Sequence, residues 1–104
     1  TECLRITDQR LPARVFTRLS PELAQQGKTA SGVPVVLQLL GGDPQMMAAN
    51  AQRAAQLGAL AIDINFGCPV PKVAKQGRAG AFFLREPDLA RQLIRATVRS
   101  VNIP

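Results

Sequence analysis

Two apolar runs separated by a sharply bounded helix constrain this chain more than any other feature. Residues 33–40 (VPVVLQLL) are rich in β-branched side chains and nearly all apolar, a pattern typical of a parallel strand buried on both faces. Asp43 and Pro44 then begin a helix, because aspartate caps helix N-termini and proline fits the first helical position. Gly58 is expected just past the end of that helix, and residues 60–66 form the next strand.

The segments on either side extend this alternation. Residues 11–23 hold apolar side chains at a spacing of four, which predicts a short helix that tolerates Pro12 in its first turn. Residues 25–32 indicate a polar loop. A Gly-rich loop follows the second strand, and another helix is predicted after residues 86–88, running to about Ser100.

The last predicted helix has two distinct sides. Arg91, Arg95 and Arg99 recur every four residues, and we interpret them as a solvated face. The other side carries a stripe expected to face the core, made of Leu89, Ala90, Leu93, Ile94, Thr97, Val98 and Val101.

Alternating strands and helices predict an α/β fold with a parallel sheet. A (β/α)₈ barrel (TIM barrel) and a doubly wound sheet both fit this order. A full barrel needs about 250 residues, so a chain of 104 residues would be a fragment of one. The chain begins at Thr1 rather than at Met and stops at Pro104, and we expect both ends to lie inside a longer protein, with another strand after Pro104.

Composition excludes several classes of protein. No apolar run approaches the roughly 18 residues that span a bilayer, so we expect no membrane association. Two cysteines and no histidine favour reduced thiols in the cytoplasm over a disulfide scaffold or a zinc site, and we expect no metal. The net charge of +6 fits a solvated basic surface and a polyanionic partner equally well.

Polar side chains interrupt both predicted strands near their carboxyl ends. Gln38 lies within the first strand, while Asp63 and Asn65 share one face of the second because side chains alternate. Chemistry in parallel α/β proteins sits at this edge of the sheet. Either the amides of Gln38 and Asn65 satisfy neighbouring backbone groups, or they point into one pocket, where they suit the O=C–N–H edge of a flavin or a pyrimidine.

Cys68 follows the second strand. Gly67 permits a tight turn before it and Pro69 stiffens the exit, so the thiol would sit near the mouth of such a pocket. A Cys–His dyad cannot form without histidine, but a protonated thiol can act as a general acid. Lys72 and Lys75 would add positive charge. The alternative is an inert cysteine in a loop.

Taken together, these motifs resemble the tRNA-dihydrouridine synthases. The resemblance covers essentially the whole chain, and its N-terminal part, which includes Thr1 and Glu2, looks most like the bacterial subgroup C, which reduces uridine 16 in the D-loop of tRNA. The residues that carry it are Val36–Gly41, Asp63–Pro69, Lys72-Val73, Gly77, Gly80-Ala81 and Leu84.

This resemblance implies an FMN-binding TIM barrel followed by a helical domain that binds tRNA. NADPH reduces the FMN, which passes a hydride to C6 of the uracil ring, and Cys68 then protonates C5. Gln38 matches the amide that contacts FMN, Asn65 the residue that contacts the target base, and Arg5 a position that contacts tRNA. Asp63 is expected to support this face rather than act chemically.

Residues 1–104 would then be the N-terminal part of the catalytic domain, with the rest of the barrel and the helical domain outside the chain. We expect the isolated segment neither to bind FMN tightly nor to catalyse, and its open sheet edges favour self-association. Arg78 stands where a smaller residue is expected, and Phe82 and Phe83 are bulkier than usual, so the loop around them is expected to differ.

Two other interpretations stay open. Another FMN-barrel pyrimidine reductase, similar to dihydroorotate or dihydropyrimidine dehydrogenase, would also place Asn and Cys near a pyrimidine and would act on free bases. A non-catalytic RNA-binding fragment would bind tRNA in a salt-sensitive manner that does not depend on Cys68.

Overall fold

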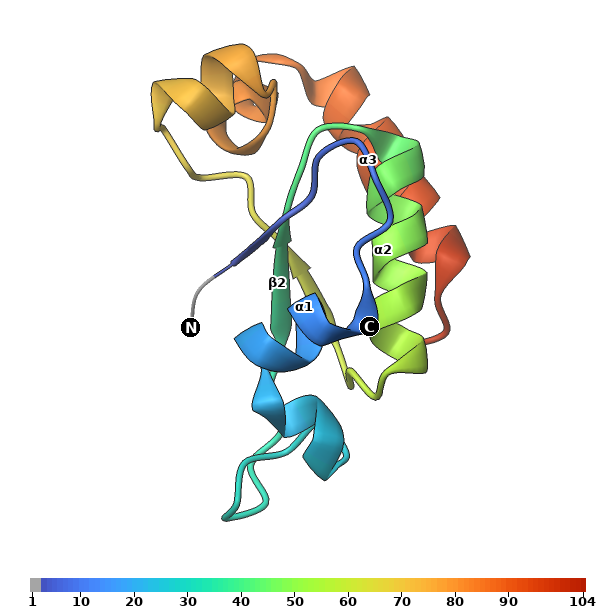
Figure 1. The fold of residues 1–104 in the computed structure, drawn as a ribbon. Helices are drawn as coiled ribbons and strands as arrows, with labels where there is room; N and C mark the ends of the chain where they lie inside the picture. Colours follow the sequence, from blue (N-terminus) through green and yellow to red (C-terminus); the bar gives the residue numbers. More distant parts are fainter. Residues whose placement is uncertain (1–2) are drawn as a thin grey trace.

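Three parallel strands form the centre of the computed structural model, which describes residues 3–104. The strands are β1 (Leu4–Arg5), β2 (Leu37–Leu40) and β3 (Ile62–Ile64), in the spatial order β1-β2-β3. Figure 1 shows this small sheet beside the long helices. The α/β fold class and the parallel sheet are therefore confirmed, while Thr1 and Glu2 of the family resemblance lie outside the described residues.

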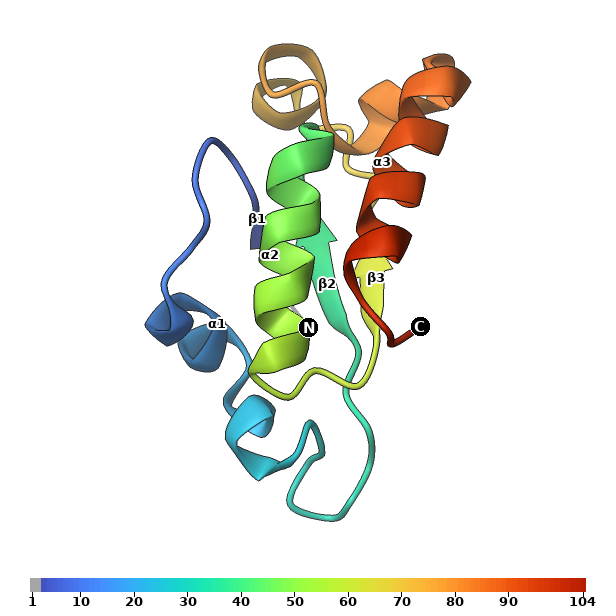
Figure 2. The ribbon, with the colours of Figure 1, turned by 90° about the vertical axis from the view of Figure 1, so that its right-hand side faces the viewer.

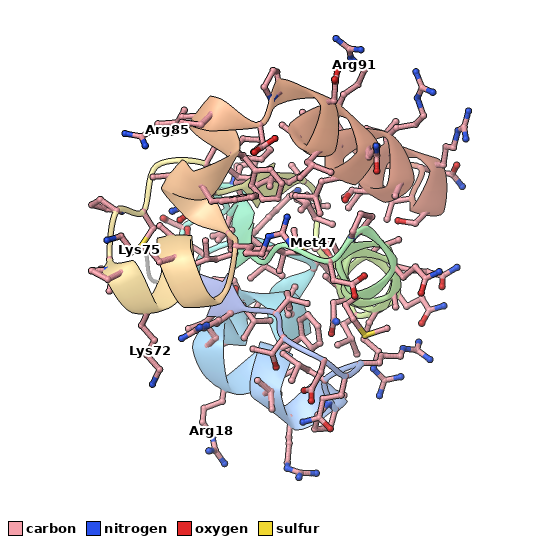
Figure 3. All side chains as sticks on the ribbon, turned by 90° about the horizontal axis from the view of Figure 1, so that it is seen from above. Arg18, Met47, Lys72, Lys75, Arg85 and Arg91 are labelled. Carbon is pink, nitrogen blue, oxygen red and sulfur yellow. The ribbon has the colours of Figure 1, made fainter. Side chains whose placement is uncertain are left out.

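Helices α2 (Pro44–Gln56) and α3 (Pro87–Ser100) pack on one face of this sheet. Both begin near the carboxyl ends of the strands and run back towards their amino ends (Figure 2). Leu39, Met47 and Leu93 come from one strand and both helices, and all three are fully buried. Each such side chain contributes about 1.5–3 kcal/mol by leaving water. Seen from above, Met47 lies inside the molecule (Figure 3).

Local signals set both ends of α2 as predicted. The Asp43 carboxylate accepts hydrogen bonds from the backbone N–H groups of Gln45 and Met46, and Pro44 occupies the first turn. Leu57 closes the helix, and Gly58 follows with φ +110°, a backbone conformation that other residues rarely adopt. The predicted cap and the predicted terminal glycine are both confirmed.

β2 and β3 are both shorter than predicted. Residues 33–36 do not join the sheet, and Val33 and Val36 are 56% and 49% exposed. The Val35 N–H donates to Gly27 O instead, at 2.9 Å, so the preceding loop captures this stretch before it reaches β1 or β3. The prediction of a strand over 33–40 buried on both faces was therefore wrong in its first half. The second strand likewise covers only residues 62–64 of the predicted 60–66.

The N-terminal helical prediction, over residues 11–23, divides into two elements. Helix α1 (Ala13–Leu19) begins after Pro12, and a 3₁₀ turn (Pro21–Gln25) follows Ser20. The split occurs at Ser20-Pro21, because proline disfavours helical geometry in the residue before it. Phe16 and Leu23 carry the apolar face of this unit into the core.

The apolar stripe of α3 is only partly buried. Leu93 and Thr97 are buried, and the Thr97 hydroxyl donates to Leu93 O at 2.8 Å. Ile94 and Val98 are 41% and 63% exposed, so their predicted place in the core is wrong for this structure. They lie on the flank of the stripe, beyond the width that α2 covers. The three arginines of the opposite side are exposed as predicted.

The segment after β3, predicted as a Gly-rich loop, contains two short helical turns. A π-helical turn spans Lys72–Gln76 and a 3₁₀ helix spans Gly80–Arg85. Both lie at the carboxyl edge of the sheet, above the ends of β1 and β2 in Figure 1. Among the helices of residues 3–104, none is long and apolar enough to cross a membrane.

Candidate functional site at the carboxyl edge of the sheet

The polar strand residues lie on the face of the sheet opposite the helices. Leu37 and Leu39 of β2 point into the core, so the alternation of side chains turns Gln38 the other way. Gln38 is the register partner of Asp63 on β3. Asn65 follows two residues later, and its backbone N–H donates to Leu39 O at 2.9 Å, which extends the pairing past the end of β3.

These side chains form one continuous chain of hydrogen bonds. The Gln38 Nε2 donates to Asp63 Oδ2 at 2.6 Å, and the Asn65 Nδ2 donates to Gln38 Oε1 at 3.0 Å. The Asn65 Oδ1 accepts from the backbone N–H groups of Gly67 and Cys68, at 2.9 and 3.0 Å. The two predicted site amides are thus in direct contact, and one of them also satisfies backbone groups, as the alternative interpretation expected.

The turn that presents Cys68 is made by the Asn65 side chain rather than by Gly67. The φ of Gly67 is not in the left-handed region, and a Cβ added there would meet no atom within 4 Å. An Asn side chain that accepts from the next residues forms a turn without glycine. The prediction that Gly67 enables this turn is therefore wrong, since other residues could adopt the same backbone.

Cys68 is held on its other side by the Gly80–Arg85 turn. Its carbonyl oxygen accepts from Ala81 N–H at 2.9 Å. The φ of Gly80 is +57°, and a Cβ added there would lie 2.8 Å from Cys68 O and 3.0 Å from Cys68 Cβ. The free thiol is half-buried against a small apolar cluster formed by Leu40, Val73 and Ala79, with Cys3 beside it. The position of Cys68 is thus fixed from both sides.

Arg5 reaches the same edge from the neighbouring strand. It ends β1, pairs in register with Leu40 and is exposed. Its Nη2 donates to Lys72 O at 3.4 Å, which ties β1 to the π-helical turn. A guanidinium has five N–H donors, so this single bond leaves most of them for a ligand.

The bulky loop residues pack on one another. The Arg78 guanidinium lies 5.1 Å from the centre of the Phe82 ring, and the Phe82 and Phe83 rings meet edge to face at 5.5 Å. Arg78 also has φ +47°, which is uncommon outside glycine. The predicted departure of this loop therefore takes the form of a cation–aromatic stack.

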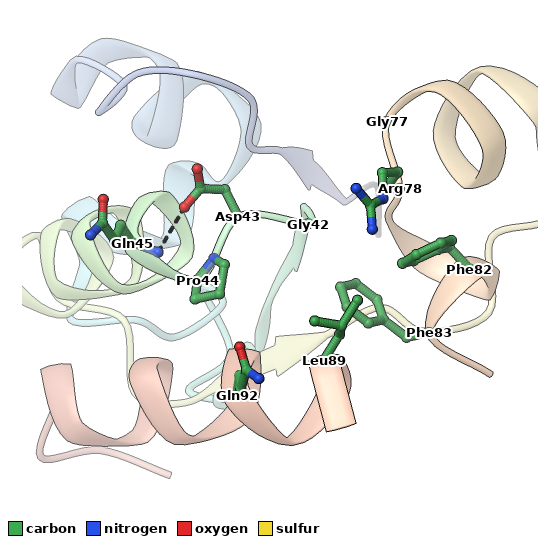
Figure 4. Close-up of a pocket in the computed structure, with 10 residues that line it drawn as sticks. All are labelled: Gly42, Asp43, Pro44, Gln45, Gly77, Arg78, Phe82, Phe83, Leu89 and Gln92. Atoms are coloured by element: carbon green, nitrogen blue, oxygen red, sulfur yellow. Dashed lines mark hydrogen bonds between the residues drawn. The ribbon is translucent and has the colours of Figure 1, made fainter. Parts of the chain in front are cut away.

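A pocket of about 710 Å³ opens between this stack and the start of α2 (Figure 4). Arg78 and Phe82 line one side, and Asp43 and Gln45 line the other. Gln38, Asn65 and Cys68 are outside its lining. No sequence pattern predicted this pocket, because its walls come from segments far apart in the chain.

Positive charge surrounds the carboxyl edge. Figure 3 shows Lys72, Lys75 and Arg85 pointing outward from the helical turns at Lys72–Gln76 and Gly80–Arg85. Within residues 3–104, no three His, Cys, Asp or Glu side chains gather closely enough to hold a metal ion. The edge thus presents cations around a thiol and two amides.

Comparison with known proteins shows which family the chain belongs to. The model of the family "Dihydrouridine synthase (Dus)" matches residues 1–104. The tRNA-dihydrouridine(16) synthase of Vibrio vulnificus is 55% identical over 96 residues, covering 92% of this chain and 30% of the relative. The enzyme of the same name from Pseudomonas putida is 49% identical, covering 100% of this chain and 32% of the relative.

The Vibrio cholerae protein of that name is 54% identical over 92% of the chain. The chain spans about a third of the length of the curated relatives it matches. The match to the family model extends over the whole of the given sequence. The chain therefore belongs to the dihydrouridine synthase family.

Proposed function

We propose that the protein carrying this chain reduces uridine 16 to 5,6-dihydrouridine in the D-loop of tRNA. The observation that carries the proposal is Cys68, which stands beyond β3 with its backbone held by Asn65 and Ala81. The names of relatives about 50% identical support the uridine position. Residues 1–104 would form the N-terminal part of a TIM-barrel catalytic domain, whose other parts complete the site.

The groups on this face fit an FMN cofactor. After its bonds to Asp63 and Asn65, Gln38 keeps one Nε2 hydrogen and one lone pair on Oε1. Such an adjacent donor and acceptor complement the O=C–N–H edge of a flavin. When bound, FMN reduced by NADPH supplies the hydride for C6 of the uracil ring.

Cys68 supplies the proton for the other carbon. As the C5=C6 double bond is lost, the S–H bond of Cys68 breaks, the proton adds to C5, and the resulting thiolate takes a proton from water before the next turnover. Asn65 contacts the base, and the base must leave the tRNA stack to reach it.

Arg5 and the cations around the carboxyl edge would hold the tRNA backbone. The chain carries 13 Lys and Arg against 7 Asp and Glu. Phosphate contacts of this kind weaken as salt rises. An NADPH-dependent activity on tRNA and the free thiols both suit the cytoplasm.

The test is the dihydrouridine content of tRNA from cells whose only copy of the full-length gene is intact, Cys68→Ala or Cys3→Ala. Loss of a general acid lowers rates by about 100-fold or more, so position 16 should stay unmodified in the Cys68→Ala cells. Cys3 borders the same apolar cluster and serves as the matched control, which should keep the modification.

Each other outcome counts against part of the proposal. Unchanged modification with Cys68→Ala at equal protein levels means that Cys68 is not the acid. Loss with both variants means that packing of the cluster, not acid chemistry, was removed. Loss at a different uridine refutes the assignment to position 16.

A further inference from the structure

The hydrogen-bond chain on the polar face has a fixed direction. It begins at the carboxylate of Asp63, which when ionised can only accept. It ends at the backbone N–H groups of Gly67 and Cys68, which can only donate. Gln38 and Asn65 lie between these ends, and each amide could in principle be turned over.

The two ends allow only one orientation of both amides. Because Asp63 must receive a hydrogen, Gln38 turns its Nε2 to Asp63 and its Oε1 to Asn65. Asn65 must then present Nδ2 to Gln38, which leaves Oδ1 for the two backbone N–H groups. Turning either amide over would bring two oxygens or two N–H groups face to face and leave polar groups unpaired, which is unfavourable.

This direction decides what Asn65 can offer to a ligand. Its Oδ1 has two lone pairs, and Gly67 and Cys68 occupy both. Its Nδ2 has two hydrogens, and Gln38 takes one. Asn65 therefore retains one N–H and no acceptor, so it can bind a carbonyl oxygen and cannot accept from an N–H group.

We infer that Asp63 is a positioning residue that fixes the orientation of Asn65 through Gln38, and so makes Asn65 a donor to a uracil carbonyl while holding the turn that carries Cys68. The inference rests on the proposed function for its substrate. Within residues 3–104, Asp63 is exposed and makes no hydrogen bond to Cys68, so it acts through the two amides.

Three substitutions of Asp63 in the full-length protein separate this role from simple packing. Asp63→Asn keeps an oxygen that can accept from Gln38. Asp63→Leu has a similar size and no acceptor. Asp63→Lys puts a donor at the start of the chain and opposes its direction, and the exposed position leaves room for the longer side chain. Asp88→Lys is the control for the charge change, because Asp88 is 86% exposed and pairs with the exposed Arg91.

The first measurement is hydrogen exchange of the Gly67 and Cys68 amides, which needs neither cofactor nor substrate. Asp63→Asn and Asp88→Lys should stay close to the parent protein. Exchange should rise by about fivefold in Asp63→Leu and by about tenfold or more in Asp63→Lys, as one and then two hydrogen bonds weaken. Equal exchange in all four variants would overturn the inference.

The second measurement is the reduction of tRNA, separated into kcat and KM. Phosphate contacts supply most of the affinity for tRNA, so Asp63→Lys should lower kcat while KM changes little. A rise in KM at constant kcat would instead assign Asp63 to tRNA binding and overturn its positioning role.

The two measurements distinguish the inference from the proposed function. If the exchange order holds but Cys68→Ala cells keep dihydrouridine, the orientation of the amides stands and the acid role of Cys68 falls. If Cys68→Ala abolishes the modification while amide exchange at Gly67 and Cys68 does not follow the expected order in the Asp63 variants, the synthase function is supported and the positioning role of Asp63 is refuted.

Discussion

The two faces of the same sheet are built on different principles. Leu39 and Gln38 are neighbours in β2, yet Leu39 lies fully buried between helices and Gln38 lies half-buried in a polar network. On the helix side, any apolar side chain of suitable volume would serve, because burial energy does not depend on direction. On the polar side, each group has a partner that only one donor–acceptor arrangement satisfies.

This difference teaches where stability and chemistry reside. The helix face contributes most of the free energy of folding, while the polar face contributes little and determines which hydrogen bonds a ligand can make. Substitutions on the first face should therefore lower stability, and substitutions on the second should disturb the site at a small cost in stability.

The largest expected effect comes from Leu39→Ala. It removes a fully buried side chain from the centre of the core, and such changes cost about 2–5 kcal/mol. The neighbouring Gln38→Leu, on the other face, should cost only about 1–2 kcal/mol, the net value of the two hydrogen bonds that it removes. Urea unfolding of the purified protein measures both, and equal losses would break the contrast between the faces.

A buried amide on the helix side gives the next largest effect. Asn50 is fully buried in α2; its Oδ1 accepts from Leu11 N–H at 2.8 Å, and its Nδ2 donates to Gln9 O at 3.2 Å and Met46 O at 2.8 Å. It fastens the chain between β1 and α1 to the core. Asn50→Leu has nearly the same volume and leaves these backbone groups unpaired, so we expect a loss of about 2–3 kcal/mol in urea unfolding.

Gln52→Leu on the exposed side of α2 is the matched control. It should change the free energy of unfolding by less than about 0.5 kcal/mol. If Asn50→Leu proves as mild as this control, the hydrogen bonds of Asn50 contribute less to stability than its burial indicates.

Elements with local determinants could be predicted from the sequence. Asp43 and Gly58 bound α2 through groups within a few residues, and their roles depend on no distant contact. The strand at residues 33–36 was lost for the opposite reason. Its apolar residues suit a strand equally well. The Val35 N–H, however, donates to Gly27 O in the preceding loop and not to a neighbouring strand.

The candidate site was predictable as a set of residues but not as a network. The positions of Gln38, Asn65 and Cys68 followed from polar residues at strand ends and from the family motif. Their bonding depends on the register that sets Gln38 opposite Asp63, which the sequence of one strand does not contain. The burial of Asn50 could have been predicted, since this residue falls on the same helical side as Met47, Ala51 and Ala54.

The smallest change in side-chain volume tests the polar face by adding one methyl group. Gly80→Ala places a Cβ 2.8 Å from Cys68 O, at φ +57°, so both the contact and the backbone conformation oppose it. A side chain in the left-handed region costs about 1–2 kcal/mol. Gly32→Ala is the matched control, because Gly32 has φ +88° and a Cβ there meets nothing within 4 Å.

Both alanine variants should therefore lose about 1–2 kcal/mol in urea unfolding, but only Gly80→Ala should displace Cys68. The rate of alkylation of the Cys68 thiol by iodoacetamide reports that displacement, since the thiol is half-buried against Leu40 and Val73. A faster reaction in Gly80→Ala and an unchanged rate in Gly32→Ala would show that a small displacement alters the polar face, even though this face contributes little to stability. Equal rates would mean that the turn around Cys68 accommodates the added methyl group without exposing the thiol. The polar face would then tolerate altered packing as well as the apolar face does.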